Sequence, residues 1–135
     1  MMFRYAAVLA LGVMPLVHAG SLDVQLENYR QQAKAAQPGF SGFSASRGQA
    51  FYLKKNQKNG KTISCASCHT SDPKREGLTP AYRKIGPMAP VVNPQRFTDS
   101  RKVEKWFRRN CDDVLSRECS PLEKGDFLTF MASIR

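Results

Sequence analysis

Histidine and cysteine are scarce in this chain of 135 residues: it has two His and four Cys, and its 11 acidic residues are outnumbered by 21 Lys and Arg. So few imidazoles leave little for sites that need several of them, such as a zinc centre with two cysteine and two histidine ligands. The sequence has no internal repeat, and no apolar run is long enough to cross a bilayer. A hydrophobic fraction of 41% suffices for one globular domain, and the formal charge of +10 favours a negatively charged partner.

The first 19 residues have the organisation of a secretory signal peptide. Arg4 precedes an apolar run, residues 5–17, and the small residues that follow fit cleavage after Ala19. Because the run is too short to cross a bilayer, we expect no membrane span after cleavage; an uncleaved anchor is the alternative. Export predicts an oxidising compartment, the periplasm. Cleavage would also remove His18 and leave His69 as the only histidine.

Residues 65–69 read Cys-Ala-Ser-Cys-His, the C-x-x-C-H pattern of a covalent c-type haem attachment site. In such a site Cys65 and Cys68 bind the haem as thioethers, and His69 becomes the proximal ligand of the iron. The alternatives are a redox-active C-x-x-C pair and half of a zinc site, but the chain has no second C-x-x-C. The motif therefore predicts one covalent haem c as the cofactor.

The two remaining cysteines, Cys111 and Cys119, belong to no second haem motif. In an oxidising compartment we expect them to form a disulfide. A loop this short would stabilise the fold by roughly 2.5 kcal/mol on the chain-entropy estimate. The bond is either a simple staple between two helices or a constraint on the neighbouring Asn110.

Helical patterns dominate the rest of the chain, and no alternating run demands a sheet, so we expect an all-α fold. Apolar spacing and capping residues, Ser21, Ser46 and the Ser120–Glu123 capping box among them, predict the helices. They cover residues 22–36, 47–55, 98 or 99 to near 112–113, and 121 to about 133. The prolines gather in residues 70–97, which we expect to be irregular and to wrap the haem.

The division of the chain follows these elements. We expect a signal peptide, then an N-terminal helical arm with its linker, and then one haem-binding domain. Their bounds are residues 1–19, 20–46 and 47–135.

The sixth ligand of the iron decides the function. The helix that begins near residue 98 places four residues on the face expected to meet the haem: Val103, Trp106, Phe107 and Asn110. A polar residue on such a face needs a partner, although a helix C-terminal asparagine or a hydrogen-bonded core amide explains Asn110 equally well. Met88 is the rival ligand, whereas Met131 lies on the apolar face of the last helix and reads as core packing.

The order of helix, haem motif, proline-rich loop and two helices resembles the small class I cytochrome c fold. Gly48 and Tyr52 are similar to the glycine and aromatic pair at which the first helix of that fold crosses the last. Gly86 and Pro87 resemble its Gly-Pro pair, whose proline carbonyl accepts a hydrogen bond from the proximal imidazole. This resemblance implies that Pro87 orients His69.

Residues 90–99 and 103–111, continued by Cys119, Pro121 and residues 123–126, resemble the SHP family, the sphaeroides-haem-protein type of oxygen-binding cytochrome c. In that family the residue matching Asn110 ligates ferric iron and leaves on reduction, opening the iron to oxygen, nitric oxide and similar ligands. The resemblance thus implies His69 and Asn110 as iron ligands, with Met88, Trp106 and Phe107 in the haem pocket. It does not extend to the N-terminal helix, which is an addition to the cytochrome c domain.

We therefore expect an exported monohaem cytochrome c that binds small diatomic ligands and exchanges electrons with a redox partner. A Met88-ligated electron carrier and a small-molecule haem enzyme are the alternatives, although the mature chain has no second histidine for acid–base catalysis. A cluster of lysines before the haem motif would steer an acidic redox protein if it rims the haem edge: Lys54, Lys55, Lys58 and Lys61. The resemblance implies that this partner is a dihaem or multihaem cytochrome c. We expect a monomer and no nucleic-acid partner.

Overall fold

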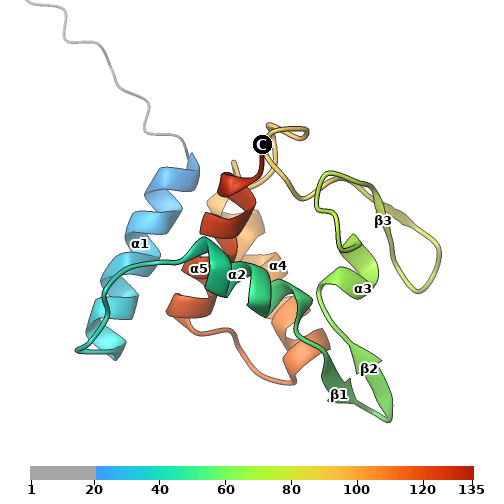
Figure 1. Ribbon diagram of the computed structural model, residues 1–135, viewed down its shortest axis with the longest axis horizontal. Coiled ribbons are helices and arrows are strands. Elements are labelled where there is room, and N and C mark those ends of the chain that lie inside the picture. Colours follow the sequence, from blue (N-terminus) through green and yellow to red (C-terminus); the bar gives the residue numbers. More distant parts are fainter. Residues whose placement is uncertain (1–20) are drawn as a thin grey trace, which may run out of the picture.

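The computed structural model describes residues 21–135, so the predicted signal peptide lies outside the described part. The helices are α1 (Ser21–Ala36), α2 (Ala45–Leu53), α3 (Ala66–His69), α4 (Ser100–Leu115) and α5 (Pro121–Ser133), and the short strands are β1 (Asn56–Lys58), β2 (Lys61–Ile63), β3 (Gly77–Leu78) and β4 (Lys84–Ile85). Helix is the dominant structure, as predicted (Figure 1). None of the helices in this part is both long and apolar enough to cross a membrane.

Helix α2 begins two residues earlier than predicted. Ser44, not Ser46, is the N-cap, and its side chain accepts a hydrogen bond from the Arg47 amide. The choice between the two serines is made by tertiary structure, because the Ser44 amide donates to the buried Asp126 carboxylate at 2.7 Å. The helix ends at Leu53, also two residues earlier than the prediction of 47–55.

The core forms where α2 crosses α5. A Cβ atom added at Gly48 would lie 2.0 Å from the Asp126 carbonyl oxygen, so only glycine permits this approach. Tyr52, one turn later, is fully buried and its ring packs against Phe127 and Phe130. The crossing predicted from Gly48 and Tyr52 is confirmed.

Helix α5 begins and ends where the sequence indicates. Ser120 and Glu123 form both hydrogen bonds of a capping box, with proline in the first turn. Met131 is completely buried, which confirms its prediction as a core residue. Leu122 is only partly buried, because it lies in the first turn of the helix.

Helix α4 starts after the N-cap Asp99, as predicted, but continues to Leu115 rather than ending near residues 112–113. Acidic residues in a last turn oppose the helix dipole by only about 0.3–1 kcal/mol. Burial of Val114 and of Cys111 outweighs that cost, and Ser116 then ends the helix in the left-handed conformation with φ 56°.

Two hairpins that the sequence did not predict flank the haem motif. Strands β1 and β2 pair in antiparallel fashion through a turn at Asn59 and Gly60, both with positive φ. Strand β3 pairs with β4 inside the proline-rich segment. Each strand has at most three residues, too few for a period-2 pattern to be visible in the sequence.

Helix α1 packs on the bundle rather than standing apart from it. Its Tyr29 and Ala33 are buried, and Leu22 and Leu26 are partly buried on the same face. The Gln25 side chain donates to the Phe97 carbonyl at 2.5 Å. In Figure 1, α1 and the motif helix α3 lie at opposite ends of the long axis, with α2, α4 and α5 between them.

Candidate haem site

The C-x-x-C-H motif folds into a single helical turn. Cys65 is the N-cap of α3, and the His69 amide donates to the Cys65 carbonyl at 3.1 Å. Cys68 precedes His69 in this turn, and both motif cysteines are free thiols. The spacing thus brings two thiols and one imidazole together on one short element.

Burial sets the ionisation of this turn. It raises the pKa of the Cys65 thiol to about 11, and burial together with the Asp113 charge raises the pKa of Cys68. Burial, together with the positive charge of Arg96, lowers the pKa of His69 to about 4. The imidazole is therefore neutral at physiological pH, which is the form that ligates a metal.

The motif turn is held from two sides. The buried Tyr52 of α2 donates to the carbonyl of Thr70, the residue after His69, at 2.6 Å. On the other side Gly77 of β3 lies against the turn, where an added Cβ atom would be 2.0 Å from the Cys68 carbonyl oxygen. The core crossing and the proline-rich segment together fix the position of the imidazole.

The residues fit a covalent haem c. The His69 Nδ1 atom is buried and has no hydrogen-bond partner within residues 21–135, so the ring is not committed to another role. Two free thiols precede it at thioether spacing. The expected hydrogen bond from His69 to Pro87 is not formed: the Pro87 carbonyl accepts from the Asn93 side chain at 2.9 Å.

Met88, the candidate rival ligand, is buried with 7% of its surface exposed. Its amide donates to the Pro73 carbonyl at 2.8 Å, which fixes the backbone. Its sulfur accepts a hydrogen bond from Arg96 Nη2 at 2.7 Å. The hydrogen bond from Arg96 and the backbone contact with Pro73 therefore hold Met88 in its present position.

The predicted haem-facing residues of α4 lie on two adjacent flanks. Val103 and Phe107 face the core, where the Phe107 ring packs edge-on against Phe127. Trp106 is half exposed, at 50%, with the Lys105 and Arg109 cations near its ring. The residues predicted to share one face of α4 therefore lie on two: Val103 and Phe107 face the core, and Trp106 lies on a more exposed flank.

Asn110 lies one turn after Trp106 on this second flank. Its side chain is partly buried and makes no hydrogen bond within the described residues. Asp113, one turn further along the same flank, is close enough to raise the pKa of Cys68. The flank that carries Asn110 therefore runs towards the haem-attachment turn.

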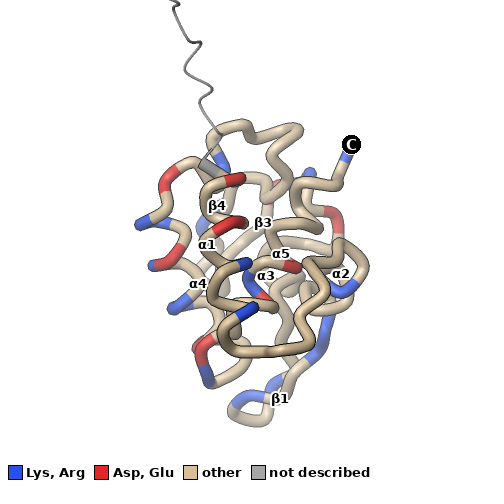
Figure 2. The backbone as a smooth tube through the Cα atoms, turned by 90° about the vertical axis from the view of Figure 1, so that its left-hand side faces the viewer, with Lys and Arg blue, Asp and Glu red and all other residues tan. Residues whose placement is uncertain are grey.

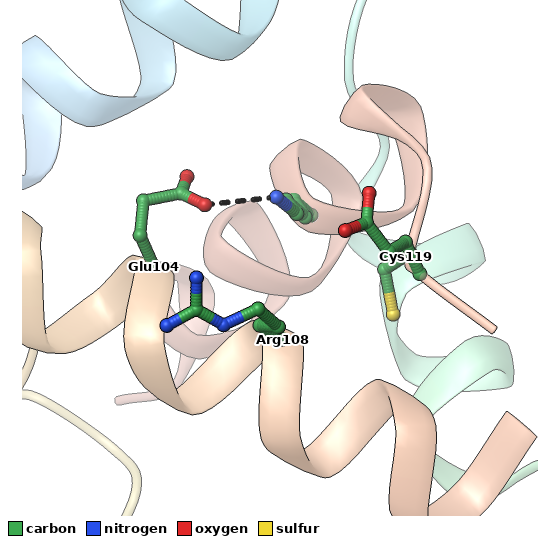
Figure 3. A pocket seen from close by; sticks show the side chains of 5 residues that line it. Glu104, Arg108 and Cys119 are labelled. Carbon is green, nitrogen blue, oxygen red and sulfur yellow. Dashed lines mark hydrogen bonds and ion pairs between the residues drawn. The ribbon is translucent and has the colours of Figure 1, made fainter. Parts of the chain in front are cut away.

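The predicted disulfide is present next to Asn110. Cys111 of α4 and Cys119 before α5 are joined, with 5.6 Å between their Cα atoms. Figure 3 shows the adjacent cleft, in which Glu104 and Arg108 on α4 lie across from Cys119. The bond ties the end of α4 to the start of α5.

Two features of the site carry no signal in the sequence. Tyr29 of α1 donates to Glu104, which also receives a hydrogen bond from Lys124 of α5 at 3.0 Å, as the dashed line in Figure 3 marks. Arg96 lies between Met88 and the Gly86 carbonyl. Both depend on contacts between residues distant in the sequence or on loop geometry, which residue spacing does not reveal.

Comparison with known proteins places the chain among cytochromes. Residues 38–131 match the family model "Domain of unknown function (DUF1924)". The chain is 47% identical over 91 residues to the cytochrome c-type protein SHP of Cereibacter sphaeroides, covering 66% of this chain and 70% of that protein. It is 40% identical over 105 residues to cytochrome c'' of Methylophilus methylotrophus, covering 76% and 73% respectively.

The solved structures that resemble this chain are also cytochromes. Oxidised cytochrome c'' of Methylophilus methylotrophus matches with a TM-score of 0.77 and 36% identity over 84% of this chain and 94% of that one. Oxidised SHP, described as an oxygen-binding cytochrome c, matches with a TM-score of 0.75 and 37% identity over 84% and 96%. A solution structure of cytochrome c'', described in relation to haem-ligand detachment, matches with a TM-score of 0.76.

Proposed function

The chain belongs to the DUF1924 family and to the SHP type of monohaem cytochrome c, and on this premise we propose that it binds small ligands such as oxygen or nitric oxide. Asn110 would hold the iron in the oxidised state and release it on reduction, which would leave the ferrous iron open to the small ligand. The protein also exchanges electrons with a redox partner. The observation that carries this proposal is the uncommitted Asn110 amide on the flank of α4 that runs towards the haem turn.

One haem c is the cofactor, and Cys65, Cys68 and His69 hold it: the two thiols as thioethers and the imidazole as proximal ligand. The haem supplies a redox-active iron that accepts an electron and takes a diatomic molecule. The chain keeps His69 neutral by burial and holds its turn through Tyr52 and Gly77. These contacts preorganise the proximal side.

Asn110 acts as the distal ligand of the oxidised state. Its amide oxygen is a neutral, weak donor, held better by a ferric than by a ferrous ion, so the amide is released when the charge falls. No protein hydrogen bond in residues 21–135 competes for that side chain. The Cys111–Cys119 bond, one residue away, limits how far the backbone at Asn110 follows the departing side chain.

A Met88-ligated electron carrier is the alternative. In the structure the Met88 sulfur accepts from Arg96 and its amide donates to Pro73, so the residue is held at both points. The Asn110 side chain makes no hydrogen bond within residues 21–135 and is free to take a ligand role. This difference favours the ligand-binding function over simple electron transfer.

Electrons arrive from an acidic redox protein, for which a dihaem or multihaem cytochrome c is the candidate. Lys54, Lys55 and Lys61 are exposed around the β1–β2 hairpin, and Figure 2 shows this basic cluster beside β1. Lys58 of the same hairpin donates to the Asp112 carbonyl near the end of α4, which ties the cluster to the distal helix. Surface charge of one sign raises association rates with an oppositely charged partner.

The protein acts in the periplasm after export and loss of residues 1–19. Covalent haem attachment and a disulfide are both chemistry of an oxidising compartment. The protein acts there as a monomer.

Optical spectra of the oxidised, reduced and CO-treated holoprotein test the proposed function. We expect a ferric spectrum without the far-red sulfur-to-iron band of methionine ligation, and a ferrous protein that binds CO rapidly. A far-red band together with a ferrous spectrum that does not change under CO would overturn the proposal in favour of the Met88 carrier.

A further inference from the structure

Arg96 is a half-buried cation in an unusual setting. It lies in the loop before α4, and its Nη2 atom donates to the Met88 sulfur at 2.7 Å and to the Gly86 carbonyl at 3.3 Å. Both acceptors are uncharged, and a thioether sulfur is a weak one. The remaining guanidinium nitrogens, Nε and Nη1, have no partner within residues 21–135.

No carboxylate within residues 21–135 forms an ion pair with Arg96. The ion pairs of the described chain engage Arg30, Arg47, Arg117 and three lysines, but not Arg96. Burial lowers the pKa of Arg96, so the protein part of the site opposes the charged form. A cation taken partly out of water without an anion is costly, which indicates that an anion belongs beside it.

Arg96 lies near the haem-attachment turn, which indicates where the anion would lie. Arg96 donates to the carbonyl of Gly86, the residue directly after β4, and β4 pairs with β3, whose Gly77 lies against the backbone of Cys68 and His69. Met88, to which Arg96 is bound, directly follows the Gly86-Pro87 pair. A haem c held by Cys65, Cys68 and His69 brings two propionate carboxylates of its own into this region.

We propose that Arg96 is the haem-propionate anchor of this protein, binding one propionate carboxylate through Nε and Nη1 while Nη2 keeps Met88 in place. A guanidinium and a carboxylate carry opposite charges and can form two parallel hydrogen bonds. The propionate would therefore compensate the Arg96 charge, which has no ion-pair partner within residues 21–135. The same guanidinium holds the Met88 sulfur through Nη2. The proposal rests on the haem c and not on Asn110.

The test reads the propionates directly. Holoprotein grown with δ-aminolevulinate labelled with 13C at its carboxyl carbon carries label only in the haem carboxylates, and their shifts are followed against pH by NMR. In the wild type we expect one of the two carboxyl groups to be the stronger acid. Arg96→Gln should weaken that acid about tenfold or more and leave the other unchanged. Arg96→Lys, which keeps the charge but loses the fork, should fall in between.

Arg101→Gln is the matched control, because it removes the same charge from an exposed position five residues later. We expect it to leave both carboxyl titrations as in the wild type. Equal titration of both propionates in Arg96→Gln and wild type would overturn the proposal. If Arg96→Gln fails to fold, the wild type alone decides: magnetisation transfer from Arg96 side-chain N–H groups to one labelled carboxylate supports the anchor, and its absence overturns it.

Discussion

Replacing Gly77 by alanine tests whether β3 is packed directly on the haem-attachment turn. The added methyl carbon would lie 2.0 Å from the Cys68 carbonyl oxygen and 2.9 Å from the Cys68 carbonyl carbon and the His69 Cα atom. These are backbone atoms, which cannot swing aside as a flexible side chain can. The strand or the turn must therefore move by about 1 Å to reach a normal contact.

The sign of the effect separates two views of this position. If Gly77 were an ordinary loop glycine, alanine would stabilise the protein by about 0.4–1 kcal/mol by restricting the unfolded chain. The contact with Cys68 predicts instead a loss of about 1–3 kcal/mol, the usual cost of forcing an extra methyl group into a packed site.

Guanidinium denaturation of the oxidised holoprotein, followed by circular dichroism, measures this difference. Gly39→Ala is the control, because a Cβ atom there meets nothing within 4 Å. We expect Gly39→Ala to be neutral or slightly stabilising and Gly77→Ala to be destabilising, with a shifted Soret band because the turn bearing His69 has moved. A Gly77→Ala protein at least as stable as Gly39→Ala would refute the packing argument.

Three further predictions concern the cofactor, the disulfide and the α1 contact. Denatured holoprotein should keep one haem, as read by mass spectrometry, and Cys65→Ala combined with Cys68→Ala should abolish it; a wild-type mass equal to the bare chain contradicts this. Cys111→Ser combined with Cys119→Ser should lower the unfolding free energy by roughly 2.5 kcal/mol in denaturant titrations, and no loss would mean that the bond is strained or idle. Burial tends to raise the pKa of Glu104, but hydrogen bonds from Tyr29 and Lys124 hold it below its ordinary value of 4.5. The wild type should therefore exceed Glu104→Gln in stability above that pH and lose the advantage as the pH falls below it; an advantage that persists at acid pH would count against the contact.

The parts of the fold that were predicted correctly are the local ones. Three features each lie within a few residues of the sequence: the capping box, the glycine-aromatic pair one turn apart and the C-x-x-C-H motif. Residue spacing alone therefore predicts them. The Cys111–Cys119 bond was likewise predictable, because these two cysteines lie outside the haem motif and only eight residues apart in a chain expected to be exported.

The parts that were missed depend on contacts between distant residues. Ser44 caps α2 because Asp126 of α5 accepts its amide hydrogen, and α4 runs past its acidic residues because Val114 is buried. The hydrogen bond from the Asn93 side chain to the Pro87 carbonyl was missed because it depends on the geometry of the proline-rich loop. Neither Arg96 nor the Glu104 contacts could be inferred from spacing alone.

The most direct test of the central claim is the ferric sixth ligand in two single variants, read by optical and electron paramagnetic resonance spectra of oxidised holoprotein. Asn110→Ala should lose the wild-type sixth ligand and take water in its place, with covalent haem retained. Met88→Ala should keep the wild-type ferric ligand, since its sulfur is bound to Arg96. If Met88→Ala loses that ligand and Asn110→Ala keeps it, the protein is a methionine-ligated electron carrier and the account of a departing Asn110 is wrong.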